Sequence, residues 1–206
     1  CDPFELTIKG RGAHAAMPQL GIDPIPVAAE IVCALQTIAS RSTDPQDAIV
    51  VSVTQIHGGS AWNVIPDEVV LRGSLRSFRP EVQDGIEPTI RRIAEGVCHA
   101  HDCQLKMMHK RGYPATINEA KATRAAARAA ADVSGQERVE IDPTPTMGAE
   151  DFAFMLKEVP GSYVWLGNGP SDGGCMLHNP RYDFNDDILT TGASYWARLV
   201  ELELAG

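Results

Sequence analysis

The sequence predicts an α/β (α+β) protein of 206 residues, in which a ferredoxin-like domain precedes part of a larger α/β domain. Two observations predict the first domain. The first is that short runs rich in β-branched residues alternate with long stretches of helical apolar periodicity. The second is their order, which is strand, helix, strand, strand, helix, strand. A third observation, an alanine-rich helical pattern that begins shortly after residue 115, marks a change of composition and predicts a boundary there.

The first domain is predicted to contain four strands, at residues 4–9, 48–57, 67–78 and 104–109, each flanked by Gly, Pro or polar residues. Asp23 and Pro24 begin a helical pattern that stays apolar on one face through residue 39. Pro80 begins the second helix, and we expect Pro88 to kink it or to delay its start. The run at 48–57 is apolar enough to be a hazardous sheet edge if nothing covers it.

The second part is predicted to contain a helix at 119–133 that ends at Gly135, a β-like run at 139–141 and a short helix through residues 152–156. A strand at 163–166 and a terminal helix with an apolar face over residues 188–204 follow. A part of about ninety residues cannot cover both faces of such a sheet. We therefore expect it to be the closing half of a larger α/β domain.

Composition excludes several classes of protein. The net charge of -9 argues against nucleic acid as a partner, because phosphate binding needs a positive surface. With 44% hydrophobic residues but no long apolar run, the sequence predicts no membrane helix and fits a cytoplasmic protein. The five cysteines are odd in number and widely scattered, so they indicate neither a disulfide framework nor a structural zinc site. Cys33 and Cys98 lie in apolar helical patterns and are expected in the core.

The run from Gly58 to Arg76 is the most informative for function. It places a neutral amide donor, Asn63, in a loop and a guanidinium, Arg76, near the far end of the strand that follows. A guanidinium can bind a carboxylate bidentately, and a rigid asparagine can donate to the same substrate, so together the two residues indicate a carboxylate clamp. On these residues alone, a turn asparagine and a solvated arginine are the commoner explanation.

Three further motifs carry candidate residues. His14 lies in a glycine-rich turn at residues 10–18, Glu150 follows Gly148 in the run 147–152, and His178 lies in a loop at 177–186. Each has a simpler explanation: an exposed histidine in the two loops, and a carboxylate that stabilises a helix N-terminus in the case of Glu150.

Together, the four motifs resemble the two-metal aminoacylase and carboxypeptidase family of metallopeptidases, in particular its hippurate hydrolase and auxin-conjugate amidohydrolase branch. They occur in the family's order over nearly the whole chain. The His-Ala-Cys-Gly-His-Asp type motif and the Glu-Glu pair, which carry most metal ligands in that family, do not occur. The chain therefore resembles a C-terminal part: residues 1–115 as a ferredoxin-like dimerisation (lid) domain, and 116–206 as the C-terminal portion of a zinc-peptidase-like catalytic domain.

The resemblance implies a role for each candidate residue. By this resemblance, His14 reaches into the active site of the partner subunit and, with Asn63, stabilises the substrate oxyanion. Arg76 binds the substrate carboxylate. Gly148 and Glu150 belong to a loop that lines the substrate cleft.

The resemblance also implies two divalent metal ions in a complete active site, with His178 as one of their ligands. The identity of the metal stays open among Zn, Mn, Co and Ni. Since catalytic zinc usually keeps three protein ligands, we expect this chain alone to bind two metals poorly and to be inactive.

The implied function is hydrolysis of the amide bond of N-acyl amino acids or related small acyl conjugates, in which metal-bound hydroxide attacks the carbonyl. The expected partners are this small-molecule substrate and a second copy of the chain, bound through the lid domain. Neither nucleic acid nor a membrane is expected as a partner. A non-catalytic dimerisation or small-molecule-binding module stays open as the alternative.

Overall fold

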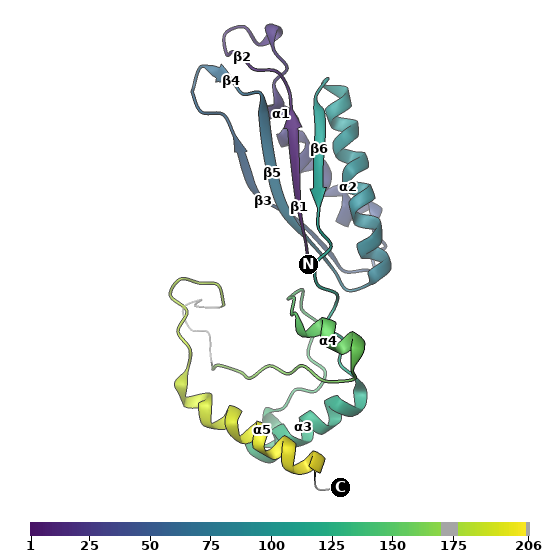
Figure 1. Cartoon of the computed structure of the whole chain (residues 1–206), viewed down its shortest axis with the longest axis vertical. Coiled ribbons are helices and arrows are strands. Elements are labelled where there is room, and N and C mark those ends of the chain that lie inside the picture. Colours follow the sequence, from purple (N-terminus) through teal and green to yellow (C-terminus); the bar gives the residue numbers. More distant parts are fainter. Residues whose placement is uncertain (170–176, 205–206) are drawn as a thin grey trace. The chain divides into compact units, whose positions relative to one another are not determined.

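The computed structural model describes residues 1–169 and 177–204 of the chain (Figure 1). Contacts between Cα atoms divide the chain into two compact units. Unit 1 comprises Cys1–Ala115 and Thr146–Asp151, and unit 2 comprises Thr116–Pro145 and Phe152–Gly206.

Unit 1 is built on a four-stranded sheet with the strand order β3-β5-β1-β6. All neighbouring strands are antiparallel, and Leu6 in the centre of β1 lies opposite Leu71 of β5 and Met107 of β6. The order and directions are those of the ferredoxin-like fold, which confirms the predicted fold class. The strands are β1 (Asp2–Lys9), β3 (Ile49–Gly58), β5 (Glu68–Ser77) and β6 (Gln104–His109).

Two helices, α1 (Pro24–Leu35) and α2 (Pro80–Ala100), cover one face of this sheet (Figure 1). The Asp23 carboxylate accepts a hydrogen bond of 2.9 Å from the Ile25 amide, as expected of an N-cap. A short π-helix, Ile38–Ser42, follows α1. The core lies between the helices and the sheet, and its fully buried members include Leu6, Ile8, Ile31, Leu35, Leu71 and Ile90.

Helix α2 decides against one of the two effects expected of Pro88, a kink or a delayed start. It begins at Pro80 and continues through Pro88, so the predicted delay of its start is wrong. Pro88 is exposed, and the carbonyl group that loses a hydrogen bond at a helical proline can be hydrated on that side. The next carbonyl, of Gly85, accepts a hydrogen bond of 2.8 Å from the Thr89 hydroxyl.

A second, two-stranded sheet was not predicted. β2 (Ala13–His14) and β4 (Val64–Ile65) pair beyond one end of the main sheet (Figure 1). Two residues are too few to show a periodic pattern, which is why the sequence did not indicate them. We call the segments around β2 and β4, residues 13–17 and 62–65, the tip.

Unit 2 contains α3 (Ala120–Ser134), α4 (Phe152–Glu158) and α5 (Leu189–Leu204), with two 3₁₀ turns at Gln136–Arg138 and Asp186–Ile188. Helix α3 ends at Gly135, where φ is +90°, as predicted. It is linked to α5 by a hydrogen bond of 2.8 Å from Arg198 Nε to Asp132 Oδ2. No residue of α5 is fully buried among the described residues: on its predicted apolar face Leu199 is half-buried, whereas Trp196, Val200 and Leu204 are exposed.

The strands predicted at 139–141 and 163–166 are wrong, because both segments are irregular. A strand needs a neighbouring strand for its hydrogen bonds, and the described part of unit 2 contains none. Instead, the Asn118 amide binds the backbone of Tyr163 on both sides, donating to its carbonyl and accepting from its N–H at 2.8 Å each.

The cysteines agree in part with expectation. Cys98 is buried, and this burial raises the pKa of its thiol to about 11. Cys33 is exposed, so its expected place in the core is wrong: it lies on the face of α1 away from the buried Ile31 and Leu35. Cys175 lies outside the described residues. None of the described helices is both long and apolar enough to cross a membrane.

Gly73 allows the central strands to approach. A Cβ atom there would lie 2.4 Å from Cζ of Phe4 and 2.2 Å from the Ser52 carbonyl oxygen. We predict that Gly73→Ala lowers the free energy of unfolding by about 1–3 kcal/mol through overpacking. In contrast, Gly85→Ala, at an exposed position of α2 with no atom within 4 Å, should raise it by up to about 1 kcal/mol. Urea denaturation of both variants tests this, and equal effects would contradict it.

Candidate functional site

The tip brings two predicted site residues together. His14 pairs with Val64, the residue after Asn63, and the Ala15 amide donates a hydrogen bond of 2.9 Å to the Asn63 carbonyl oxygen. His14 and Asn63 are far apart in the sequence and are neighbours in the structure. Their backbones are fixed to each other by this ladder, so the relative position of the two side chains is restricted.

Both side chains offer a hydrogen-bond donor to a ligand. The Ala16 amide donates to Nδ1 of His14 at 3.0 Å, and because an N–H needs a lone pair, the neutral imidazole carries its own proton on Nε2. The Asn63 side chain has no hydrogen bond to any described residue, so its amide N–H groups are free. Both residues are exposed. Neutral donors on two neighbouring segments of this kind suit an oxygen that gains negative charge.

The glycine-rich turn that leads to His14 is held at several points. The backbones of Arg11 and Ile22 exchange two hydrogen bonds of 2.9 Å. A Cβ atom at Gly10 would lie 2.1 Å from the Ile22 carbonyl oxygen, so only glycine allows this approach. Asp67 accepts two further hydrogen bonds of 2.8 Å, one from the Gly10 amide to its carbonyl oxygen and one from the Gly12 amide to Oδ1. Asp67 was not among the predicted site residues. An aspartate directly before a strand and after Pro66 is the signal that could have indicated a turn-binding carboxylate.

Arg76 lies at the other end of β5, where the structure places it against a different predicted segment. Its Nη1 donates a hydrogen bond of 2.5 Å to the Met147 carbonyl oxygen. The next residues of this segment are Gly148, which is exposed, and Glu150, which is half-buried. The guanidinium and the predicted substrate-binding segment are therefore neighbours within unit 1.

The distance along β5 corrects one interpretation. Asn63 precedes the start of β5 at Glu68, and Arg76 lies eight residues further along the strand, which corresponds to about 27 Å. A single-chain clamp formed by Asn63 and Arg76 is therefore wrong. The alternating sequence pattern predicted the strand but not the consequence that its two ends cannot contact one small ligand.

His178 belongs to unit 2. It is exposed and has φ of +69°, a left-handed conformation that is uncommon for residues other than glycine. The turn that follows is closed by hydrogen bonds from the Arg181 amide to Asn179 Oδ1 and from the Tyr182 amide to the Asn179 carbonyl, at 2.8 and 2.9 Å. Backbone strain of this kind often marks functional positions.

The residues present do not by themselves fit a dinuclear metal site. Within residues 1–169 and 177–204, no three His, Cys, Asp or Glu side chains lie close enough to hold an ion. His178 offers one ligand, whereas a catalytic zinc ion usually has three from the protein.

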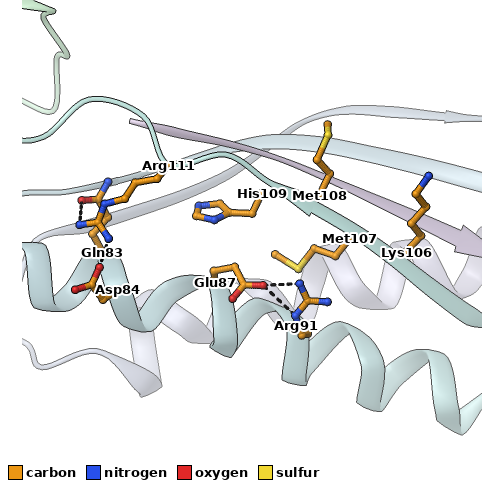
Figure 2. A pocket seen from close by; sticks show the side chains of 9 residues that line it. All are labelled: Gln83, Asp84, Glu87, Arg91, Lys106, Met107, Met108, His109 and Arg111. Carbon is orange, nitrogen blue, oxygen red and sulfur yellow. Dashed lines mark hydrogen bonds and ion pairs between the residues drawn. The ribbon is translucent and has the colours of Figure 1, made fainter.

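A groove between α2 and β6 contains none of the predicted site residues (Figure 2). Four of its charged groups form two pairs: Glu87 accepts hydrogen bonds from Arg91 at 2.6 and 2.9 Å, and Asp84 pairs with Arg111. Exposed pairs of this kind contribute little to stability. The groove is consistent with a solvated surface and is not a candidate site.

Comparison with known proteins agrees with the resemblance. The chain is 35% identical to N-acetylcysteine deacetylase of Bacillus subtilis (strain 168) over 204 residues, which are 98% of this chain and 52% of that protein. It is 34% identical to hippurate hydrolase of Campylobacter jejuni over 198 residues, covering 96% of this chain and 51% of that protein. The chain thus spans about half the length of these curated relatives.

A solved structure supports the same conclusion. The YXEP protein of Bacillus subtilis, described as a dinuclear metal-binding peptidase of the M20 family, superposes with a TM-score of 0.72 at 31% identity. The superposition covers 99% of this chain and 50% of that one. Residues 6–202 match Peptidase family M20/M25/M40. The four motifs, the ferredoxin-like fold of unit 1 and these similarities together show that the chain belongs to peptidase family M20/M25/M40.

Proposed function

We propose that this chain is part of a metal-dependent amidohydrolase that cleaves the amide bond of N-acyl amino acids or related small acyl conjugates. The observation that carries the proposal is the tip itself, where backbone pairing makes His14 and Asn63 neighbours and each side chain keeps a free donor, Nε2–H of His14 and the amide of Asn63. The relatives named above, a hippurate hydrolase and an N-acetylcysteine deacetylase, support an amide of a small acyl group as the substrate. In this proposal residues 1–115 are the dimerisation domain and 116–206 belong to the catalytic domain, in a cytoplasmic enzyme.

The two donors act on the oxygen of the scissile amide. When a nucleophile adds to the carbonyl carbon, the oxygen becomes negatively charged, and donors already in place stabilise that charge without reorganisation. The tautomer of His14 matters here, because a neutral ring with its proton on Nε2 donates to the oxyanion. The loss of one such donor typically lowers kcat by about 10²–10³-fold.

Arg76 binds the carboxylate of the amino acid part. One guanidinium N–H is used by the Met147 carbonyl oxygen, which orients the group and leaves other N–H donors for a bidentate contact. The adjacent residues, Gly148 and Glu150, are then placed to line the substrate site.

Metal ions supply the remaining chemistry when they are bound, by activating water and polarising the carbonyl group. Zinc, manganese, cobalt or nickel are candidates, two per complete site, and His178 is the ligand proposed from this chain. Since the described residues do not form a metal site and the chain spans about half the length of its relatives, the other ligands are proposed to come from a part of the enzyme outside the described residues. The chain alone is therefore expected to be inactive.

A complete site combines two copies of the chain. The tip and Arg76 of one copy lie at opposite ends of β5. One small substrate that binds Arg76 of one copy is therefore contacted by the tip of a second copy. The edge strand β3 suits the contact between copies: nothing pairs with its outer side in the described residues, and Ile56 is 59% exposed. Pairing of β3 with β3 of a second copy would extend the sheet and cover this edge.

We predict that Arg76→Ala lowers kcat/KM for substrates with a free carboxylate. The expected decrease corresponds to a loss of about 2–5 kcal/mol of transition-state stabilisation. Arg76→Lys should restore only part, because an ammonium cannot form the bidentate contact. The variants should be assayed on an N-acyl amino acid and on its carboxamide. A disturbed Met147 segment would affect both compounds equally, so only a selective loss on the free acid supports the contact between Arg76 and the substrate carboxylate, and an equal loss contradicts it.

Subunit exchange tests the two-copy site. In a mixed dimer of His14→Ala and Arg76→Ala subunits, one of the two sites combines an intact tip with an intact Arg76. We expect the mixture of these two inactive variants to recover activity, up to one active site per mixed dimer.

The matched control mixes His14→Ala with Asn63→Ala. Because both residues lie on the same tip, each site of that mixed dimer receives one damaged tip, and no recovery is expected. Recovery in the control, or none in the first mixture despite exchange shown by mass spectrometry, would rule out an intact tip acting in the partner's site.

A further inference from the structure

One residue connects the main sheet to the tip. β1 ends at Lys9, opposite Glu68 of β5, and the chain then turns through Gly10, Arg11 and Gly12 towards His14. Asp67 contacts both sides of that turn: its carbonyl oxygen accepts from the Gly10 amide and its Oδ1 accepts from the Gly12 amide, each at 2.8 Å. The backbone contact continues the β1–β5 ladder. The carboxylate contact lies beyond it, where no strand partner is available to Gly12.

The other hydrogen bonds that hold the turn and the tip are local or link backbone to backbone. β2 and β4 have two residues each, and so short a pair is only marginally stable by itself. Among the described residues, Asp67 supplies the one side chain that hydrogen-bonds to the backbone of residues 10–13. Gly12 allows this approach, because a Cβ atom there would lie 3.0 Å from Asp67 Oδ1 and 2.9 Å from the Ile65 carbonyl oxygen.

We propose that Asp67 is a positioning residue whose carboxylate fixes the Gly10–Gly12 turn and thereby the place of His14 beside Asn63. A hydrogen bond to an ionised acceptor is stronger than a neutral one, which suits the one side-chain contact that supplements the backbone hydrogen bonds of Gly10 and Arg11 in this turn. The functional part of this inference rests on the proposed function. The structural part does not, and the two can be tested separately.

The structural test uses this chain, labelled with ¹⁵N, and measures amide hydrogen exchange and the His14 ring nitrogens by NMR. In Asp67→Ala, we expect the Gly12 amide to exchange at least about tenfold faster, as for loss of a hydrogen bond to a charged group. The His14 ring should lose its preference for the Nε2–H tautomer. Asp67→Asn keeps an oxygen that can accept from Gly12 and should retain most of the protection. Glu68→Ala removes the neighbouring exposed carboxylate and should leave both signals unchanged.

The functional test measures kinetics in the metal-loaded amidase that contains this chain. Asp67→Ala should lower kcat by about tenfold, less than the roughly 10²-fold expected for removal of an oxyanion donor, and should leave KM unchanged. Asp67→Asn should recover most of the loss and Glu68→Ala should match the wild type. General loss of folded protein would reduce the concentration of active sites, so kcat is calculated for each titrated active site.

The outcomes separate the two claims. Unchanged exchange of the Gly12 amide in Asp67→Ala, or the same change in Glu68→Ala, overturns the positioning role. Faster exchange with an unchanged kcat supports the positioning role and overturns the proposed catalytic role of His14.

Discussion

The antiparallel pairing of β1 with β5 is the constraint on which the rest of unit 1 depends. These are the two central strands, paired from Asp2 opposite Leu75 to Lys9 opposite Glu68. Since side chains alternate between faces, a slip of one residue would move Leu6 and Leu71 from the core to the solvent face, so the buried apolar side chains specify the register strongly. The same register brings the residues after Lys9 next to those before Glu68, and the tip with His14 and Asn63 forms there. The core therefore determines where the polar site is built.

This pairing also separates the tip from Arg76. A strand is rigid and extended, so residues at its two ends cannot approach each other by a local movement of the chain. Any reaction that needs both His14 and Arg76 on one small substrate must then use two copies, and assembly becomes a requirement of the site and not only a contribution to stability. The exposed edge of β3 and the shortness of the tip are consistent with a unit that is completed by association. Both features would be liabilities in a monomer.

The sequence predicted the elements whose signal is local and periodic. All four strands of the main sheet, helices α1, α2, α3 and α5, and the Asp23 cap follow from patterns of side chains over six or more residues or from a specific cap. It could not predict β2 and β4, whose two-residue strands form only because β1 and β5 bring them together. It also misplaced a strand at 163–166, where the Asn118 side chain binds the backbone of Tyr163 instead. Among the candidate residues, the motifs indicated His14, Asn63 and Arg76, while the three-dimensional arrangement decided which of them are neighbours.

The two units differ in how their apolar surfaces are covered. In unit 1 the apolar faces of α1 and α2 pack on the sheet, and burial there supplies the usual driving force of about 25 cal/mol for each Å² removed from water. In unit 2, by contrast, Trp196, Val200 and Leu204 of α5 are 62%, 53% and 78% exposed, and Trp165 is 63% exposed. Several large apolar side chains exposed in one small unit are characteristic of a surface that contacts further protein. This contrast fits a chain that spans about half the length of its relatives: the ferredoxin-like unit encloses its own core, whereas the described helices of unit 2 leave several large apolar side chains exposed.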